Sequence, residues 1–151
     1  MQQKDTCEIL VVTALPEEIQ ALKSPLGLSF NTPTPIPNSA LSYYKKKFLV
    51  GEKTYDIAVI CLNSMGNPKS SIKTSIAVNY LNPTFVIMFG LAGGIPGEVK
   101  LTDVIISDEI FYVGQGKQRP NSREIRLESL QVDALLLHRL QDYRLQLGDK
   151  S

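Results

Sequence analysis

Four glycines, Gly90, Gly93, Gly94 and Gly97, stand between two apolar runs in the stretch MFGLAGGIPGEVKLTDVIISDE, residues 88–109. Glycines directly after a buried strand let another group approach the backbone closely, because no Cβ stands in the way. Their spacing is not G-x-G-x-x-G, and the residues that follow have the character of a strand, whereas a dinucleotide site needs a helix N-terminus. No G-K-[S/T] follows, so a P-loop is excluded as well. The glycines therefore indicate either a ligand-binding loop or a tight connection between two strands.

Glu18 is the carboxylate best placed for chemistry, because it lies just past the first apolar run, where a side chain can enter a crevice at the strand end. Its placement alone favours a helix-start acid that the positive end of the helix dipole stabilises. The functional alternative is a general acid or base whose pKa a partly dry pocket would raise.

Other chemistries lack the residues they need. The only histidine, His138, lies in the last amphipathic segment, so neither a Ser-His-Asp triad nor a histidine metal site is expected. Cys7 and Cys61 fit no metal-ligand or C-x-x-C spacing, and we expect reduced thiols in strands. We expect no metal and no cofactor. The basic residues Lys117, Arg119, Arg123 and Arg126 could face a phosphate-bearing ligand, but their surroundings favour a solvated loop.

The elements that would position these residues alternate between strands and helices. Proline-rich residues 31–39 and polar residues 113–126 are expected to be loops, and Asn67 and Pro68 suit the start of a helix as its N-cap and first residue. The expected strands cover residues 7–15, 41–50, 54–63, 83–90 and 103–112, and the expected helices cover residues 16–23, 67–81 and 128–147.

This order, with a hairpin over residues 41–63, predicts a single α/β domain over residues 1–151 whose sheet is mixed and flanked by helices. In such sheets ligands bind beyond the carboxyl ends of the strands. Three loops are expected there: TALPEE (13–18), NSMGN (63–67) and GLAGGIPG (90–97).

The composition is that of a folded protein rather than a disordered one. Of 151 residues, 43% are hydrophobic and 21% are charged, which is enough for a core. Sixteen basic and fifteen acidic residues leave a formal charge of +1, so neither nucleic acid nor an anionic membrane is expected as a partner. No apolar run reaches a bilayer-spanning length, and the first residues lack a signal peptide's apolar region. A cytoplasmic location is therefore expected.

In combination, the three loops resemble those of the nucleoside phosphorylase superfamily, which includes purine nucleoside and uridine phosphorylases and methylthioadenosine/S-adenosylhomocysteine nucleosidases. The resembling motifs are the acid pair of TALPEEIQALK, the small-residue–Met–Gly loop of NSMGNPKSS, the G-x-A-G-G of GLAGGIPG and the following strand VKLTDVIISDE. Their order and spacing match over about residues 7–112. The resemblance implies a mixed-sheet α/β fold that binds or cleaves N-glycosidic bonds, with a small-molecule nucleoside or nucleotide as its ligand.

By the same resemblance, Glu18 matches the acid that activates the attacking water in the nucleosidases. Such cleavage passes through an oxocarbenium-like sugar, so a carboxylate has to steer the nucleophile to the anomeric carbon. Ala92 and Gly93 match loop residues around the ribose and base, and Leu15 and Met65 match apolar residues around the sugar. The expected substrate-binding residues, with their loop neighbours, are Ala14, Leu15, Met65, Gly66, Leu91, Ala92 and Gly93.

The chain departs from the family pattern in three places. Leu91 stands where many members carry a serine, and Met88 stands where bacterial purine phosphorylases carry a phosphate-binding arginine. Phosphate recognition wants arginine forks or hydroxyl donors, so hydrolysis is favoured over phosphorolysis. Family enzymes are also longer, and nothing after Tyr112 resembles their ribose-gripping Met-Glu segment or the Asp that protonates the leaving purine. We therefore expect the N-terminal portion of the fold, apparently truncated.

Two functions stay open at this point, beside a purely structural remnant. One is a nucleosidase in which Glu18 guides water, incomplete without a C-terminal half. The other is a non-catalytic module that binds or senses a purine nucleoside or nucleotide within a larger protein or assembly. An incomplete sheet exposes apolar surface, so we also expect a homo-oligomer or a partner domain that covers it.

Overall fold

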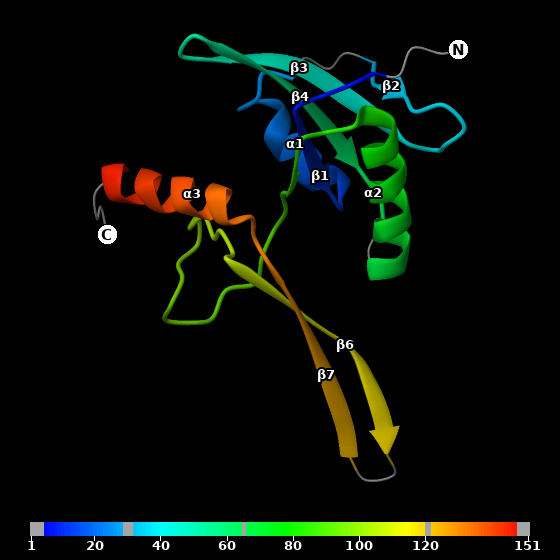
Figure 1. Ribbon diagram of the computed structural model, residues 1–151, viewed down its shortest axis with the longest axis vertical. Helices are drawn as coiled ribbons and strands as arrows, with labels where there is room; N and C mark the ends of the chain where they lie inside the picture. Colours follow the sequence, from blue (N-terminus) through cyan, green and yellow to red (C-terminus); the bar gives the residue numbers. More distant parts are fainter. Residues whose placement is uncertain (1–4, 29–31, 65, 120–121, 148–151) are drawn as a thin grey trace. The chain divides into compact units, whose positions relative to one another are not determined.

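The computed structural model describes residues 5–28, 32–64, 66–119 and 122–147, and it consists of two compact units, Met1–Gly93 and Gly94–Ser151 (Figure 1). The interpretation of residues 1–151 as a single domain stays a prediction. The candidate loops after the first three parallel strands all begin in the first unit.

The first unit is built on a five-stranded mixed sheet with the order β2-β3-β4-β1-β5. The central strand, β1 (Ile9–Thr13), pairs in parallel with β4 (Lys53–Cys61) and β5 (Phe85–Met88). The long strand β3 (Ser42–Val50) runs antiparallel to β4, and β2 (Thr34–Pro35) pairs with the start of β3. A run such as ILVVT is suited to this central place, because it can bury apolar, mostly β-branched side chains on both faces. The predicted mixed α/β sheet is confirmed.

Two helices cover opposite faces of this sheet (Figure 1). The helix α1 (Pro16–Lys23) contributes Ile19 to a cluster with Val59, and α2 (Asn67–Leu81) contributes Leu81 to a cluster with Leu10 on the other face. Both helices lie where the sequence predicts them. Their packing fixes the strand ends from which the candidate loops leave.

The N-cap of α2 differs from the prediction by one residue. The N-cap is Gly66, not Asn67, and no side-chain hydrogen bond caps the helix. The physical reason is the backbone at Gly66, whose φ of 95° is open to glycine and strained for other residues. The chain turns there, and Asn67 is already helical.

The second unit contains a hairpin of β6 (Glu109–Arg119) and β7 (Ser122–Gln131), followed by the helix α3 (Ala134–Leu147). The predicted loop over residues 113–126 is therefore wrong, because strand pairing uses backbone groups that a polar sequence supplies as well as an apolar one. The predicted strand over residues 103–112 is strand only from Glu109 onward.

The last helix begins at Ala134 rather than at residue 128, because residues 122–131 belong to β7. Asp133 caps it: the Asp133 carboxylate accepts hydrogen bonds from the backbone N–H groups of Leu135 and Leu136, each at 3.0 Å. In the proline-rich stretch 31–39, Thr34–Pro35 form a short strand rather than a loop.

Many apolar side chains stay accessible outside the sheet's interior. In the first unit they include those of β5, and in the second unit Leu101 and Val104 are examples. Within the described part of the chain, no helix has the length and apolar character needed to cross a membrane. An oligomer or a covering partner domain stays a prediction.

Candidate functional site

The carboxyl ends of β1, β4 and β5 are held together by backbone hydrogen bonds. The Leu62 N–H donates to Thr13 O at 2.9 Å, and the Ser64 N–H donates to Ala14 O at 3.2 Å, which joins the ends of β1 and β4. The Phe89 N–H donates to Val12 O at 2.9 Å, which joins β5 to β1. The starts of the three loops expected to meet, TALPEE, NSMGN and GLAGGIPG, therefore lie at one edge of the sheet.

Glu18 lies in the first turn of α1, and its carboxylate joins two of these loops. Its Oε2 accepts the N–H groups of Ala14 at 2.8 Å and Leu15 at 2.9 Å. Its Oε1 accepts the N–H of Leu91 at 3.1 Å, across 73 residues of sequence. The bond to Leu15, the N-cap of α1, is the backward half of a capping box. Only 7% of the Glu18 surface is exposed, so this carboxylate is an interior group of the strand-end site.

The pKa of Glu18 moves opposite to the expected direction. Burial alone raises the pKa of a carboxyl group, but the backbone N–H groups of Leu15, Leu91 and Ala14 together outweigh burial and hold the Glu18 pKa below its ordinary value of 4.5. Among the described residues, no charged side chain contributes to this shift. The expectation of a raised pKa is wrong, and Glu18 is ionised at neutral pH. It can serve as a base or an anion there, but not as an acid.

The described hydrogen bonds leave one acceptor position on the Glu18 carboxylate for a further partner. A carboxylate has about four acceptor positions, two on each oxygen. On Oε2, Ala14 and Leu15 use both, whereas Oε1 accepts only the Leu91 N–H among the described bonds. The remaining position on Oε1 is therefore where a water molecule could be held.

The predicted substrate-binding residues fall into three groups. Ala14, Leu15 and Leu91 contact Glu18 through their backbone N–H groups, and Leu91 as a residue is 87% exposed. Ala92 and Gly93 are exposed next to Leu91, and Gly66 caps α2. Met65 lies outside the described residues, as do the side chains of Lys117, Arg119, Arg123 and Arg126.

A groove of about 820 Å³ begins at Ala14, whose backbone N–H donates to Glu18 Oε2, but Glu18, Leu15 and Leu91 are not among the residues that line it. It runs from the strand ends at Ala14 and Met88 along one face of α2. The hydroxyl groups that line it on this helix are those of Ser70, Ser71, Thr74 and Ser75.

These hydroxyls are the residues that the sequence interpretation missed. Their spacing of one and four residues places them on a single helix face, and that spacing is a signal that the sequence contains. No charged side chain lines the groove among the described residues. Such walls can hydrogen-bond the hydroxyls of a sugar or the edge of a base.

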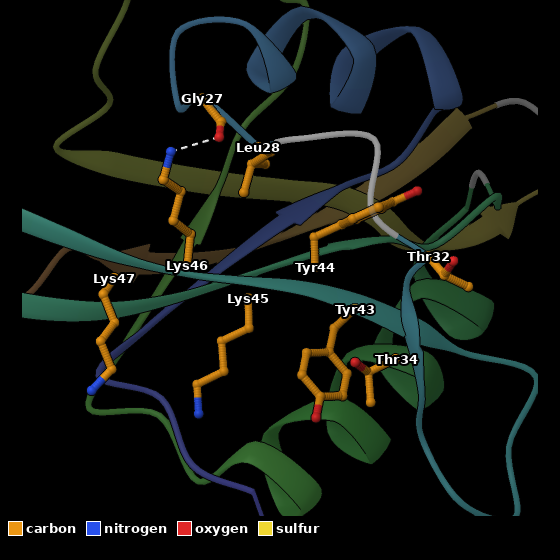
Figure 2. Close-up of a pocket in the computed structure, with 9 residues that line it drawn as sticks. All are labelled: Gly27, Leu28, Thr32, Thr34, Tyr43, Tyr44, Lys45, Lys46 and Lys47. Atoms are coloured by element: carbon orange, nitrogen blue, oxygen red, sulfur yellow. Dashed lines mark hydrogen bonds between the residues drawn. The ribbon is translucent and has the colours of Figure 1, made fainter.

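A second cavity, of about 520 Å³, lies along β3 and contains three consecutive lysines (Figure 2). Figure 2 shows that Lys46 points to Gly27, whose carbonyl oxygen accepts its hydrogen bond at 2.5 Å, while Lys45 and Lys47 lie on the other side of the strand. The three charges therefore do not converge on one point. Lys45 is also paired with Asp5 at 2.6 Å. This cavity is a weaker candidate for an anion site than its composition indicates.

Within the described residues, no cluster of three or more His, Cys, Asp or Glu side chains could hold a metal ion. Cys7 is buried, Cys61 is partly exposed, and both are free thiols.

Comparison with known proteins gives one family and several partial relatives. A sequence model of the phosphorylase superfamily matches residues 8–150. ATP nucleosidase Cap17 of Escherichia coli (strain KTE188) is 26% identical over 107 residues, which cover 71% of this chain and 21% of that protein. Uncharacterized protein y4jS of Sinorhizobium fredii is 29% identical over 112 residues, covering 74% and 27%.

A methylthioadenosine/S-adenosylhomocysteine nucleosidase, that of Staphylococcus epidermidis, is 24% identical over 102 residues, covering 68% of this chain and 41% of that protein. The chain thus spans less than half the length of each of these relatives.

Proposed function

The chain belongs to the phosphorylase superfamily, as its loops predicted, and we propose that it supplies the carboxylate side of a site that hydrolyses the N-glycosidic bond of a nucleoside or nucleotide. Nucleosidase relatives support cleavage of that bond at the level of the family. The observation that carries the proposal is the Glu18 carboxylate: buried, ionised and held by three backbone N–H groups at the strand ends.

The chemistry follows from what such a carboxylate can do. As the bond to the base breaks, positive charge develops on the sugar, and a fixed negative charge nearby stabilises it. The free acceptor position on Oε1 orients a water molecule and takes its proton as the water attacks the anomeric carbon. Because its pKa is lowered, Glu18 acts mainly by position and charge rather than as a strong base.

The groove favours water over phosphate as the nucleophile. Phosphate sites generally use arginine forks or several cationic donors. Among the described residues that line the groove there is no arginine and no lysine. Its hydroxyl groups suit the sugar and base of the substrate.

Departure of the base requires a proton, and Glu18 is ionised. The described residues that line the groove include no Asp, Glu or His. We assign this proton to a part of the polypeptide or assembly outside the Met1–Gly93 unit. This agrees with matched segments that cover 21% to 41% of the relatives.

A non-catalytic binding module is the second candidate, and one observation favours it. Three of the four acceptor positions of Glu18 are used by the protein's own backbone, so the carboxylate also acts as a tie between two loops. In that case the groove would bind a purine nucleoside or nucleotide and report its presence to other domains, and no bond would be cleaved.

One experiment separates the two functions. Purified protein is incubated with a panel of purine and pyrimidine nucleosides and nucleotides, with and without phosphate, and free base is measured by chromatography. The melting temperature is measured with the same panel. Release without phosphate identifies a nucleosidase and its substrate, whereas release that requires phosphate contradicts hydrolysis. A raised melting temperature without any release shows that the chain alone binds but does not cleave, which fits the binding module and also a site whose leaving-group proton comes from another polypeptide.

A further inference from the structure

We propose that Gly90 is a positioning residue for Glu18: the absence of a side chain at residue 90 lets the loop after β5 approach closely enough for the Glu18 carboxylate to bond the Leu91 N–H. The importance of this role for activity rests on the proposed function. The geometric claim itself does not, and it can be tested separately.

The space around Gly90 carries the inference. A Cβ placed on Gly90 would stand 2.7 Å from Glu18 Oε1, 3.2 Å from its Cδ and 3.6 Å from its Oε2. The first of these distances is well inside van der Waals contact. No side chain larger than hydrogen therefore fits at residue 90 while Glu18 keeps its place.

Backbone conformation does not explain the glycine. The glycines with positive φ among the described residues are Gly27, Gly51, Gly66 and Gly97, so Gly90 does not have the left-handed backbone that would itself favour glycine. Gly93 provides a control for the same substitution, because a Cβ at Gly93 would meet no atom within 4 Å. Of these neighbouring glycines, Gly90 is the one whose missing side chain makes room for Glu18.

A substitution at Gly90 should move the carboxylate rather than the strand. Residue 90 follows β5, whose register against β1 is fixed by strand pairing and by the bond from Phe89 N–H to Val12 O. The Glu18 carboxylate, in contrast, is the end of a flexible side chain. A methyl group at residue 90 would therefore push Oε1 away from Leu91, while Oε2 stays near the N–H groups of Ala14 and Leu15.

Leu91 gains a role from the same geometry. Its side chain departs from the serine common in the family, but the bond to Glu18 comes from its backbone N–H, which every residue except proline supplies. The identity of residue 91 can therefore change without loss of the contact. The identity of residue 90 cannot.

The first test is a carboxyl titration by NMR of the full chain, with Gly90→Ala and the matched control Gly93→Ala. We expect Gly90→Ala to raise the pKa of Glu18, because the Leu91 N–H no longer stabilises the ionised form. Gly93→Ala should leave that titration unchanged. An unchanged titration in folded Gly90→Ala would overturn the proposal.

The wild-type protein provides a second measurement that does not depend on how any variant folds. The amide signal of Leu91 should shift with pH at the same midpoint as the Glu18 carboxyl signal, because the two groups are bonded. An amide that does not follow this titration would contradict the contact and, with it, the role of Gly90.

The activity test uses the substrate found by the base-release panel. We expect Gly90→Ala to lower kcat by about 10- to 100-fold with a smaller change in KM, because a displaced carboxylate misdirects the nucleophile. In a Glu18→Gln background, Gly90→Ala should cause little further loss, since both changes act on one group. Additive losses would overturn the positioning role. If no substrate is cleaved but the titrations behave as expected, the proposed function fails and the geometric claim stands.

Discussion

The carboxylates before and after β1 are stabilised in different ways. Before the strand, both carboxylates have a lysine partner in addition to one backbone N–H: Asp5 accepts hydrogen bonds from Tyr43 Oη and Lys45 Nζ, each at 2.6 Å, and Glu8 lies 3.8 Å from Lys53 Nζ. After the strand, Glu18 accepts three backbone N–H groups and, among the described residues, has no lysine or arginine partner. Asp5 and Glu8 remain accessible to solvent, whereas Glu18 is buried.

The difference shows which carboxylate has charge available for chemistry. A carboxylate paired with lysine is neutralised locally, and solvent and salt screen what remains. Backbone N–H groups hold a carboxylate ionised without adding a compensating charge, so its field still acts on a bound substrate. Asp5 and Glu8 therefore serve structure, and Glu18 is the carboxylate that can stabilise a cationic sugar.

The largest expected effect is on base release. Glu18→Gln keeps the size of the side chain but removes its charge and basicity, so we expect base release to fall by about 100- to 10,000-fold. Asp5→Asn removes the charge before β1 and should leave release unchanged. Rates are measured by chromatography of the free base, and an equal loss in both variants would erase the distinction between the two carboxylates.

The next effect is on stability in acid. The pKa of folded Glu18 lies below 4.5, so its contribution to stability is complete above about pH 4.5 and is lost as pH falls through the lower, folded value. Denaturant unfolding at a series of pH values measures this dependence. In Glu18→Gln, the free energy of unfolding should fall less steeply as pH drops below about 4.5 than it does in the wild type. The same pH dependence in both proteins would contradict the lowered pKa.

A smaller effect is expected for the ion pair before β1. Burial raises the pKa of Asp5, but hydrogen bonds from Lys45, Tyr43 and Thr6 together lower it below its usual value. The side chains of Asp5 and Lys45 are 35% and 28% exposed, so Asp5→Asn should lower the free energy of unfolding by about 0.2–1 kcal/mol. Urea unfolding at low and high salt tests this, and the loss should shrink at high salt. If the loss of unfolding free energy were the same at low and high salt, the ion pair with Lys45 would not be its cause.

The smallest effect is expected for the pair of Lys53 and Glu8, whose atoms are 3.8 Å apart on the surface. Lys53→Met should change the free energy of unfolding by less than about 0.5 kcal/mol, because such pairs contribute little in water. The same urea unfolding provides the measurement. A change larger than that of Asp5→Asn would reverse the ranking of these two pairs.

The sequence predicts the first unit better than the second for a physical reason. The strands β1 and β5 are apolar runs that the sequence shows directly, although β5 is exposed in the structure, and Pro16 and Pro68 mark helix starts. The hairpin of β6 and β7 pairs through backbone groups, so its polar composition resembles that of a loop. The cap of α3 was readable in principle, since Asp133 precedes the helix.

Some features of the site can also be predicted from local sequence, whereas others depend on contacts between distant residues. Glu18 is placed by its position after β1, and the Ser/Thr face of α2 could have been found from its spacing. The partner Leu91 lies 73 residues away, and the aim of three N–H groups at one carboxylate depends on strand pairing. Burial could be guessed from sequence, but the sign of the pKa shift could not, because those N–H groups decide it.

The most direct test of the catalytic role of Glu18 compares two neighbouring acids in the first turn of α1. Glu17 is exposed and Glu18 is buried, so Glu17→Gln and Glu18→Gln make the same chemical change in two environments. The measurement is the initial rate of base release in phosphate-free buffer, with the sugar product identified alongside. We expect free sugar at the wild-type rate from Glu17→Gln and almost none from Glu18→Gln. Equal rates from the two variants would contradict the assignment of the chemistry to Glu18.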